Sequence, residues 1–163
     1  MEKRELSKAE WLDKAEAYCA RSEHCAADVR RKLYEWGAPA DLFDENGVIE
    51  PLWREIEEKL YEQDFLNDER FCRAYVHDKV AYQSWGRLKI QAGLRALQLP
   101  ESAIRTAIAD IDEEQYFKNL RALIASRSND APNKLLRFLA QRGFTLEEIQ
   151  RAPKDLFPEG SEN

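Results

Sequence analysis

The sequence contains few of the residues that build metal centres and disulfide frameworks. Its 163 residues include three cysteines and two histidines. Cys19, Cys25 and Cys72 are odd in number and lack framework spacing, which indicates reduced thiols in a reducing compartment. No Cys-x-x-Cys pair occurs, and Cys72 lies five residues from His77, off one helical face. We therefore expect buried thiols, no disulfide, no metal and no cofactor.

Long apolar runs and catalytic motifs are also missing. No segment approaches the roughly 20 apolar residues that cross a bilayer, and residues 1–5 are not followed by the apolar core of a signal peptide. The sequence has no glycine-rich phosphate loop, no zinc-binding His-Glu pair and no Ser/His/Asp order. An enzyme with only two histidines would need a mechanism based on carboxylates, and we find no arrangement of acidic residues that suits one. These absences predict a cytoplasmic protein that is not an enzyme and has no membrane partner.

Charge is distributed along the chain in blocks. The net charge of -6 argues against a protein that coats nucleic acid, because such binding depends on lysine and arginine neutralising phosphates. Residues 41–69 hold eleven acids and two bases, residues 70–99 hold six bases and one acid, and residues 120–154 hold seven bases and three acids. The two basic blocks are therefore the candidate surfaces for a partner.

These blocks supply the candidate partner-binding residues, which would meet acidic patches or phosphates. They are Arg73, Lys79, Trp85, Arg87, Lys89, Arg95, Arg121, Arg127, Lys134, Arg137 and Arg142. Alternatively, these basic residues lie on a solvated helix face and form ion pairs with acidic residues four positions away. Trp85 is a candidate for stacking on a base or filling a partner pocket, whereas Tyr82 and the other three tryptophans are expected in the core.

Apolar residues recur with the period of a helix, and no segment alternates with period two, so the predicted fold class is all-α. Ser7 with Glu10 and Thr145 with Glu148 have the spacing of capping boxes. Ser22 is the expected cap of a second helix. These signals place helix starts near both ends of the chain.

The middle of the chain is less uniform. Asn67 is the expected cap of a central helix whose apolar side carries Phe71, Tyr75 and Tyr82. Residues 41–47 fit either a short helix or an acidic loop, and residues 51–63 form a helix with an acidic outer face. That face either mimics DNA or contacts a basic partner, or it is simply solvated.

Three segments of the sequence align as an internal repeat. Apolar residues recur in register at Val29, Ile90 and Leu135, and again four residues later. The aligned helix stops are Gly37, Gln98 and Gly143, and the aligned anchors of the following helix are Phe43, Ile104 and Ile149. Units this short cannot bury their apolar faces alone, so they are expected to stack. The prediction is three tandem three-helix repeats in an elongated, curved body, with an extra helix between repeats 1 and 2.

The predicted boundaries are residues 8–48 for repeat 1, 49–65 for the linking helix, 66–112 for repeat 2, 113–153 for repeat 3 and 154–163 for a flexible acidic tail. Because the stacked repeats cover one another, a monomer is favoured.

Four motifs resemble the RecX family of bacterial regulatory proteins. They are Arg30-Arg31-Lys32-Leu33, the central Leu66-Asn67-Asp68-Glu69-Arg70-Phe71-Cys72, Gly86-Arg87-Leu88-Lys89-Ile90, and Arg137-Phe138-Leu139-Ala140-Gln141-Arg142-Gly143-Phe144. The resemblance covers residues 10–152. It implies three tandem three-helix repeats that lodge along the groove of a RecA filament on DNA, and a modulator, usually an inhibitor, of the RecA recombinase in recombination, DNA repair and the SOS response.

One departure from the family pattern concerns DNA. Residues 80–85, where the family is commonly rich in arginine and lysine, contain neither. Direct contact with single- or double-stranded DNA is therefore expected to be weak, and we expect that reversing Arg87 and Lys89 to Glu weakens filament binding. The alternatives are a DNA-binding protein with a helix-turn-helix-like pair around Ser84, whose affinity would fall steeply with salt, or a generic helical scaffold for another protein.

Overall fold

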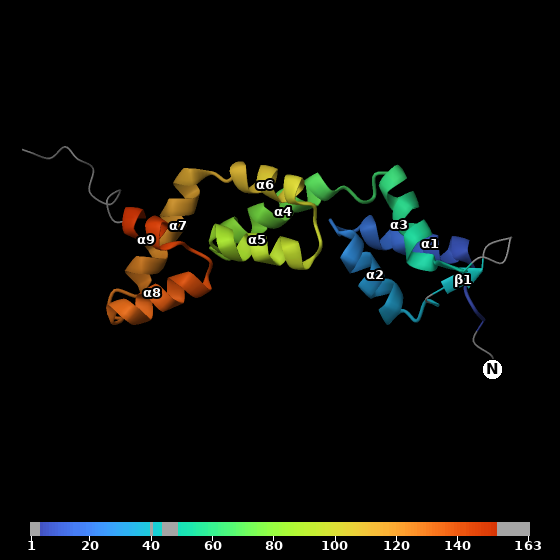
Figure 1. Ribbon diagram of the computed structural model, residues 1–163, viewed down its shortest axis with the longest axis horizontal. Helices are drawn as coiled ribbons and strands as arrows, with labels where there is room; N and C mark the ends of the chain where they lie inside the picture. The colour runs from blue at the N-terminus through green and yellow to red at the C-terminus, as the bar shows by residue number, and fades with distance from the viewer. Residues whose placement is uncertain (1–3, 40, 44–48, 153–163) are drawn as a thin grey trace, which may run out of the picture. The chain divides into compact units, whose positions relative to one another are not determined.

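The computed structural model describes residues 4–39, 41–43 and 49–152. Apart from one small hairpin, the regular secondary structure of these residues is helical, which confirms the all-α class (Figure 1). The helices are α1 (Lys8–Cys19), α2 (Ala26–Glu35), α3 (Leu52–Glu62), α4 (Asp68–Ala81), α5 (Arg87–Ala96), α6 (Glu101–Ala109), α7 (Glu113–Ser126), α8 (Pro132–Gln141) and α9 (Leu146–Arg151), and the strands are β1 (Asp41–Phe43) and β2 (Ile49–Pro51). The chain divides into two compact units, residues 1–71 and 72–163. None of the helices described is long and apolar enough to span a bilayer. The tail predicted over residues 154–163 lies outside the described residues.

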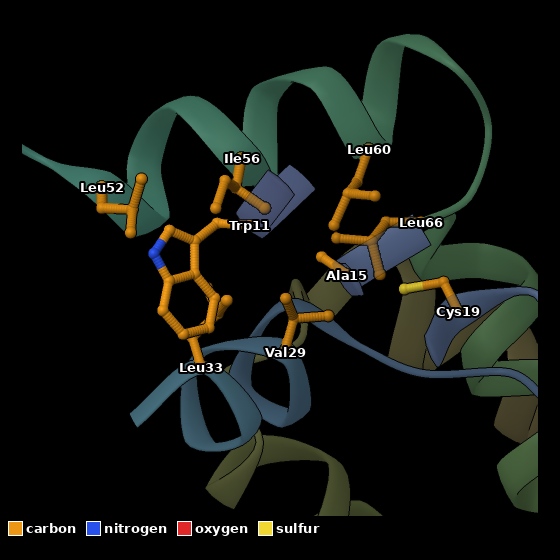
Figure 2. Packing of buried hydrophobic residues seen from close by; sticks show 9 residues of the cluster. All are labelled: Trp11, Ala15, Cys19, Val29, Leu33, Leu52, Ile56, Leu60 and Leu66. Carbon is orange, nitrogen blue, oxygen red and sulfur yellow. The ribbon is translucent and has the colours of Figure 1, made fainter. Parts of the chain in front are cut away.

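In the first unit, α1, α2 and α3 enclose one core (Figure 2). Ser7 caps α1 in a capping box with Glu10, as predicted. Trp11 of α1 points between α2 and α3, and only 5% of its surface is exposed. The other buried members are Ala15, Cys19, Val29, Leu33, Leu52, Ile56, Leu60 and Leu66. Each fully buried Leu or Ile here contributes about 1.5–3 kcal/mol relative to an exposed one, so packing, rather than helix propensity, stabilises the group.

The structure corrects the predicted organisation of the first repeat. The helix expected between repeats 1 and 2 is α3, and Leu52, Ile56 and Leu60 bury its apolar face in the core that α1 and α2 form. It is therefore the third helix of the first group and not an extra one. Phe43, the predicted anchor of a third helix, instead lies in β1, which pairs antiparallel with β2. Neither a helix nor an acidic loop occupies residues 41–43, because these residues make strand hydrogen bonds to residues 49–51.

The aligned helix stops share one geometry. Gly37, Gln98 and Gly143 all have a positive φ, at 79°, 61° and 96°. In each case the following amide donates to the carbonyl five residues before it: Ala38 to Leu33 at 2.9 Å, Leu99 to Leu94 at 3.2 Å and Phe144 to Leu139 at 3.1 Å. This left-handed ending satisfies carbonyls that the last helical turn leaves free. The repeat seen in the sequence is therefore a repeat of the helix C-cap.

The second unit contains α5 to α9 and most of α4. Its core includes Val76, Val80, Ile90, Leu94, Ile104, Ala107, Tyr116, Phe117, Leu120, Leu139 and Phe144. The Tyr116 ring contacts both Phe117 and Phe144, with centroids 5.5 and 5.4 Å apart. Asp112 caps α7 by accepting from the Gln115 amide, and Thr145 caps α9 in the predicted capping box.

The buried side of α4 differs from the predicted one. Phe71 is buried, but the next core positions are Cys72, Val76 and Val80. Tyr82 was expected in the core and is 78% exposed, because α4 ends at Ala81 and Tyr82 follows its last turn.

Candidate functional site

All eleven predicted partner-binding residues belong to the second unit, where the turn between α4 and α5 brings four of them together. Ser84 in this turn has a φ of 52°, and the Trp85 amide donates to the Lys79 carbonyl at 3.0 Å. This bond folds Trp85 back over the last turn of α4. The indole is half-buried, and the ammonium groups of Lys79 and Lys89 lie 4.4 and 4.3 Å from its ring centroid.

Two lysines at this distance from one indole are held by attraction between each cation and the negative face of the ring. Neither lysine forms an ion pair among the residues that the structure describes. Trp85 therefore contacts both lysines, and its predicted stacking on a base stays a prediction. The result is two half-buried lysines held at a fixed place.

A third cation reaches the same turn from α8. The Arg142 guanidinium donates to the Gln83 carbonyl oxygen. The turn that Arg142 begins also touches α5, because Gly143 lies directly against Lys89 and Gly86. We call Lys79, Trp85, Lys89 and Arg142 the cationic patch.

Arg87 does not belong to this patch, although the sequence predicts it as a contact residue. Its guanidinium pairs with Glu148 at 2.9 Å and also with Glu113, and its side chain is only 21% exposed. The Tyr116 hydroxyl donates to the second Glu148 oxygen at 3.1 Å and accepts from the Arg87 amide at 3.0 Å. Burial by itself would lower the pKa of Arg87, but the Glu148 hydrogen bond and the nearby Tyr116, Glu113 and Glu148 raise it. Arg87 is thus a structural residue joining α5 to α7 and α9.

Four other predicted residues already have partners. Arg95 pairs with Glu101 at 2.6 Å. Asp130 pairs with both Arg127, at 3.3 Å, and Lys134, at 3.6 Å. Arg121 on α7 is half-buried and also has an interaction partner.

The remaining two, Arg73 on α4 and Arg137 on α8, are exposed and have no ion pair within the described part of the chain. Sequence position alone did not separate the free bases from the paired ones, because most of the pairs join different helices.

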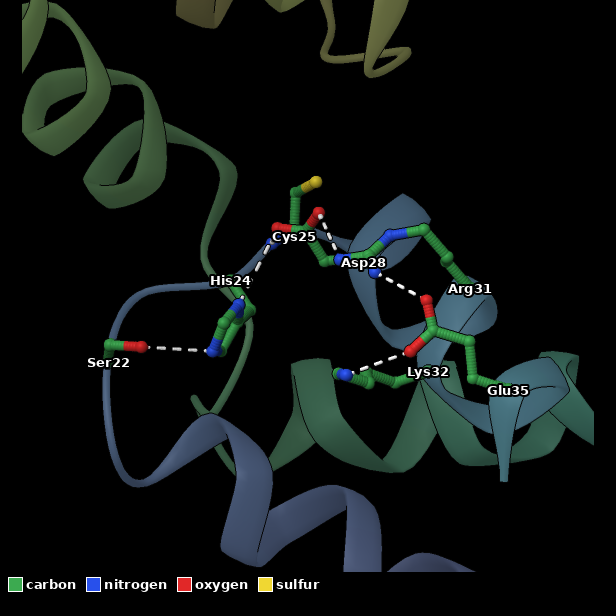
Figure 3. Close-up of polar contacts among 7 residues, drawn as sticks. All are labelled: Ser22, His24, Cys25, Asp28, Arg31, Lys32 and Glu35. Carbon is green, nitrogen blue, oxygen red and sulfur yellow. Dashed lines mark hydrogen bonds and ion pairs between the residues drawn. The ribbon is translucent and has the colours of Figure 1, made fainter.

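The cysteines and histidines are distributed without a metal site. Among the described residues no three potential ligands lie together. Figure 3 shows the start of α2, where Ser22 bonds His24 at 3.0 Å and the Cys25 amide donates to Asp28 at 3.4 Å. The helix begins after Cys25, so Ser22 is not its cap, contrary to the prediction. Burial raises the pKa of Cys19 and of Cys25 to about 11, so both thiols stay protonated at neutral pH.

The sequence reasoning missed a groove on the other side of α4. Its polar rim includes His77, Asp110, Asp112 and Gln115 beside the predicted Arg73. The residues of α4 that line the groove recur at offsets of three and four, so the sequence does indicate that they share one face of the helix. The residues on the opposite side come from the junction of α6 and α7, and the sequence does not show that this junction lies against α4.

Comparison with known proteins shows which family has this sequence and fold. Residues 67–108 match the model of the second three-helix domain of RecX. A regulatory protein RecX from Chlorobaculum tepidum is 30% identical over 162 positions, covering 96% of this chain and 94% of the relative. One from Pelodictyon phaeoclathratiforme is 30% identical and covers 86% of this chain and 84% of its own. The crystal structure of RecX from Lactobacillus salivarius shares the fold, with a TM-score of 0.69 at 18% identity over 91% of this chain and 96% of that one. The chain described here therefore belongs to the RecX family of regulatory proteins.

Proposed function

We propose that this protein binds the RecA filament on DNA in the bacterial cytoplasm and lowers its ATPase and recombinase activity. Membership of a family of regulatory proteins supports a binding role.

The observation that carries the proposal is the cationic patch. Lys79 and Lys89 are held against Trp85 without a carboxylate partner among the described residues, and Arg142 lies beside them. A solvated helix face would be expected to pair such bases with acids, as Arg95 and Arg127 are paired. Unpaired, pre-positioned cations suit phosphates or acidic side chains of a nucleoprotein filament.

The helix-turn-helix alternative is less well supported. In that motif the first residues of the second helix contact base edges in the major groove. Here the start of α5 is occupied by other parts of the second unit: the Gly86 and Leu88 amides donate to the Arg142 and Gly143 carbonyls at 2.7 and 3.1 Å. Arg87, which would be a leading reader of bases, is held by Glu148. The small number of cations in the cationic patch also predicts weak binding to DNA alone.

The test is the single-stranded-DNA-dependent ATPase of the cognate RecA, with this protein added at substoichiometric amounts. We expect the ATPase to fall, and the double variant Lys79→Glu/Lys89→Glu to need at least about tenfold more protein for the same inhibition, because two interface charges are reversed. The matched control is Arg105→Glu/Lys118→Glu, which makes the same charge change at exposed positions of α6 and α7.

Binding of the protein alone to DNA, measured at several salt concentrations, separates the two candidate functions. An unchanged RecA ATPase together with tight, salt-sensitive DNA binding would replace the proposal with direct DNA binding. Equal inhibition by the patch variant and the control would remove the cationic patch from the interface.

A further inference from the structure

A second surface of the same unit has chemistry unlike that of the cationic patch. Along α4, five residues at offsets of 0, 3, 4, 7 and 8 line one side of an open groove that encloses about 380 Å³: Arg73, Val76, His77, Val80 and Ala81. The opposite side consists of Ala107 near the end of α6, Asp110 and Ile111 after it, and Asp112 and Gln115 at the start of α7. The groove therefore follows one face of a helix over two turns.

The floor of the groove is apolar. Val76, Val80, Ala107 and Ile111 form it, and each retains between 2% and 8% of its surface exposed. Such a floor gains stability when apolar side chains cover it, at about 25 cal/mol for each Å² removed from water.

The rim carries charges of both signs on opposite sides. Arg73 lies on the α4 side and is exposed and unpaired among the described residues. Asp110 and Asp112 lie on the other side, and Asp110 follows the last turn of α6, whose free carbonyls add to the negative potential. A phosphate backbone is repelled by these carboxylates and gains nothing from the apolar floor. The groove therefore fits a protein segment, not DNA.

The length of the groove fits a short helix. From residue 73 to residue 81 the axis of α4 advances about 12 Å, since each residue of a helix adds about 1.5 Å. Two turns of a partner helix cover the same length with apolar side chains at positions i, i+3 or i+4, and i+7. Tyr82, 78% exposed, packs edge-on to His77 beside one end of the groove.

We infer that this groove holds a two-turn amphipathic helical segment of RecA, with a basic residue towards Asp110 and Asp112 and an acidic residue towards Arg73. The inference depends on the proposed function and assigns its two kinds of contact to two surfaces. The groove binds the protein part of the filament, and the cationic patch binds its negatively charged part.

Two variants test the groove without disturbing the core. Ala81→Trp adds a large side chain at the mouth of the groove from an exposed position, and its control is Ala92→Trp, at an exposed alanine of α5. Asp110→Lys reverses a rim charge at a helix end where a cation is favoured, and its control is Asp13→Lys on α1. Circular dichroism and thermal melting establish that all four variants fold.

The readout is affinity for the RecA filament and, separately, for single-stranded DNA alone. We expect Ala81→Trp to weaken filament binding at least tenfold and Asp110→Lys about fivefold, with both controls and all DNA affinities within twofold of the wild type. A photo-crosslinking residue at position 81 is expected to couple to RecA and not to DNA.

The outcomes separate the two ideas. Wild-type affinity for the filament in a folded Ala81→Trp variant, or a crosslink from position 81 to DNA, overturns the inference and leaves the proposed function standing. A wild-type protein that fails to bind the filament overturns the proposed function and, with it, the groove as a RecA site.

Discussion

Replacing Gly86 with alanine is expected to separate α5 from the turn between α8 and α9. A Cβ atom at Gly86 would lie 2.3 Å from both the carbonyl carbon and the carbonyl oxygen of Gly143, and 2.5 Å from the Phe144 amide nitrogen. Ordinary contacts of a Cβ begin at 3.4 Å. Because the obstacle is backbone and cannot rotate away, the two segments must move apart by about an ångström.

That movement disrupts two hydrogen bonds across the junction. The Gly86 amide donates to the Arg142 carbonyl at 2.7 Å, and the Leu88 amide donates to the Gly143 carbonyl at 3.1 Å. A lost hydrogen bond that leaves a buried group unsatisfied costs about 1–3 kcal/mol. For two such bonds we therefore expect Gly86→Ala to lower the free energy of unfolding by about 2–6 kcal/mol, which corresponds to roughly 4–24 °C in Tm for a chain of this size.

Thermal melting followed by circular dichroism measures the loss, and hydrogen exchange at the Gly86 and Leu88 amide positions locates it. Gly86 is also the N-cap of α5, where alanine is a poor cap. Gly86→Ser separates the two causes, because serine is a good cap but carries the same Cβ. If serine restored wild-type stability, capping and not the close approach to Gly143 would explain the loss, and our reading of the junction would be wrong.

Three further predictions concern Gln98, the pair Cys19 and Cys25, and Glu10. Gln98→Gly is expected to raise the free energy of unfolding by up to about 1 kcal/mol, because Gln98 holds a φ of 61° that glycine adopts without a steric cost; a decrease measured by urea denaturation would contradict this. Alkylation of Cys19 and Cys25 by iodoacetamide in the folded protein is expected to be slow at pH 8 and to accelerate towards pH 11, and rapid labelling at pH 7 would refute their protonated state. Hydrogen bonds with the backbone and side chain of Ser7, together with Arg4, hold the pKa of Glu10 below its usual value. The stabilisation of α1 by ionised Glu10 is therefore present above pH 4.5 and is lost as the pH falls through the lowered pKa. Glu10→Gln is expected to remove this part of the loss of helicity in acid, measured by circular dichroism.

The sequence predicted best what depends on neighbouring residues. The capping boxes at Ser7 and Thr145 and the shared stops at Gly37 and Gly143 are local, because a cap requires only four to six consecutive residues. Gln98 was found only by alignment with the two glycines, since glutamine is not a usual residue for a left-handed conformation.

Predictions that depended on distant residues were less successful. Arg87 looked like a free base because its partners, Glu113 and Glu148, lie 26 and 61 residues away. The hairpin was missed although Asn46-Gly47, a dipeptide common in hairpin turns, lies between its strands in the sequence. Helical periodicity identifies a buried face but not the segment that covers it, so α3 was assigned to the wrong place.

The contrast between Arg87 and the cationic patch separates folding from binding in their response to ionic strength. The Arg87–Glu148 pair is sheltered, with 21% and 13% of the two side chains exposed, whereas charges on an exposed interface are screened over about 8 Å at physiological salt. Under the proposed function, a rise in salt therefore weakens filament binding well before it loosens the junction between α5 and α9. The protein would then dissociate intact and be ready to bind again, so its occupancy of the filament would follow the ionic conditions without a cycle of unfolding and refolding.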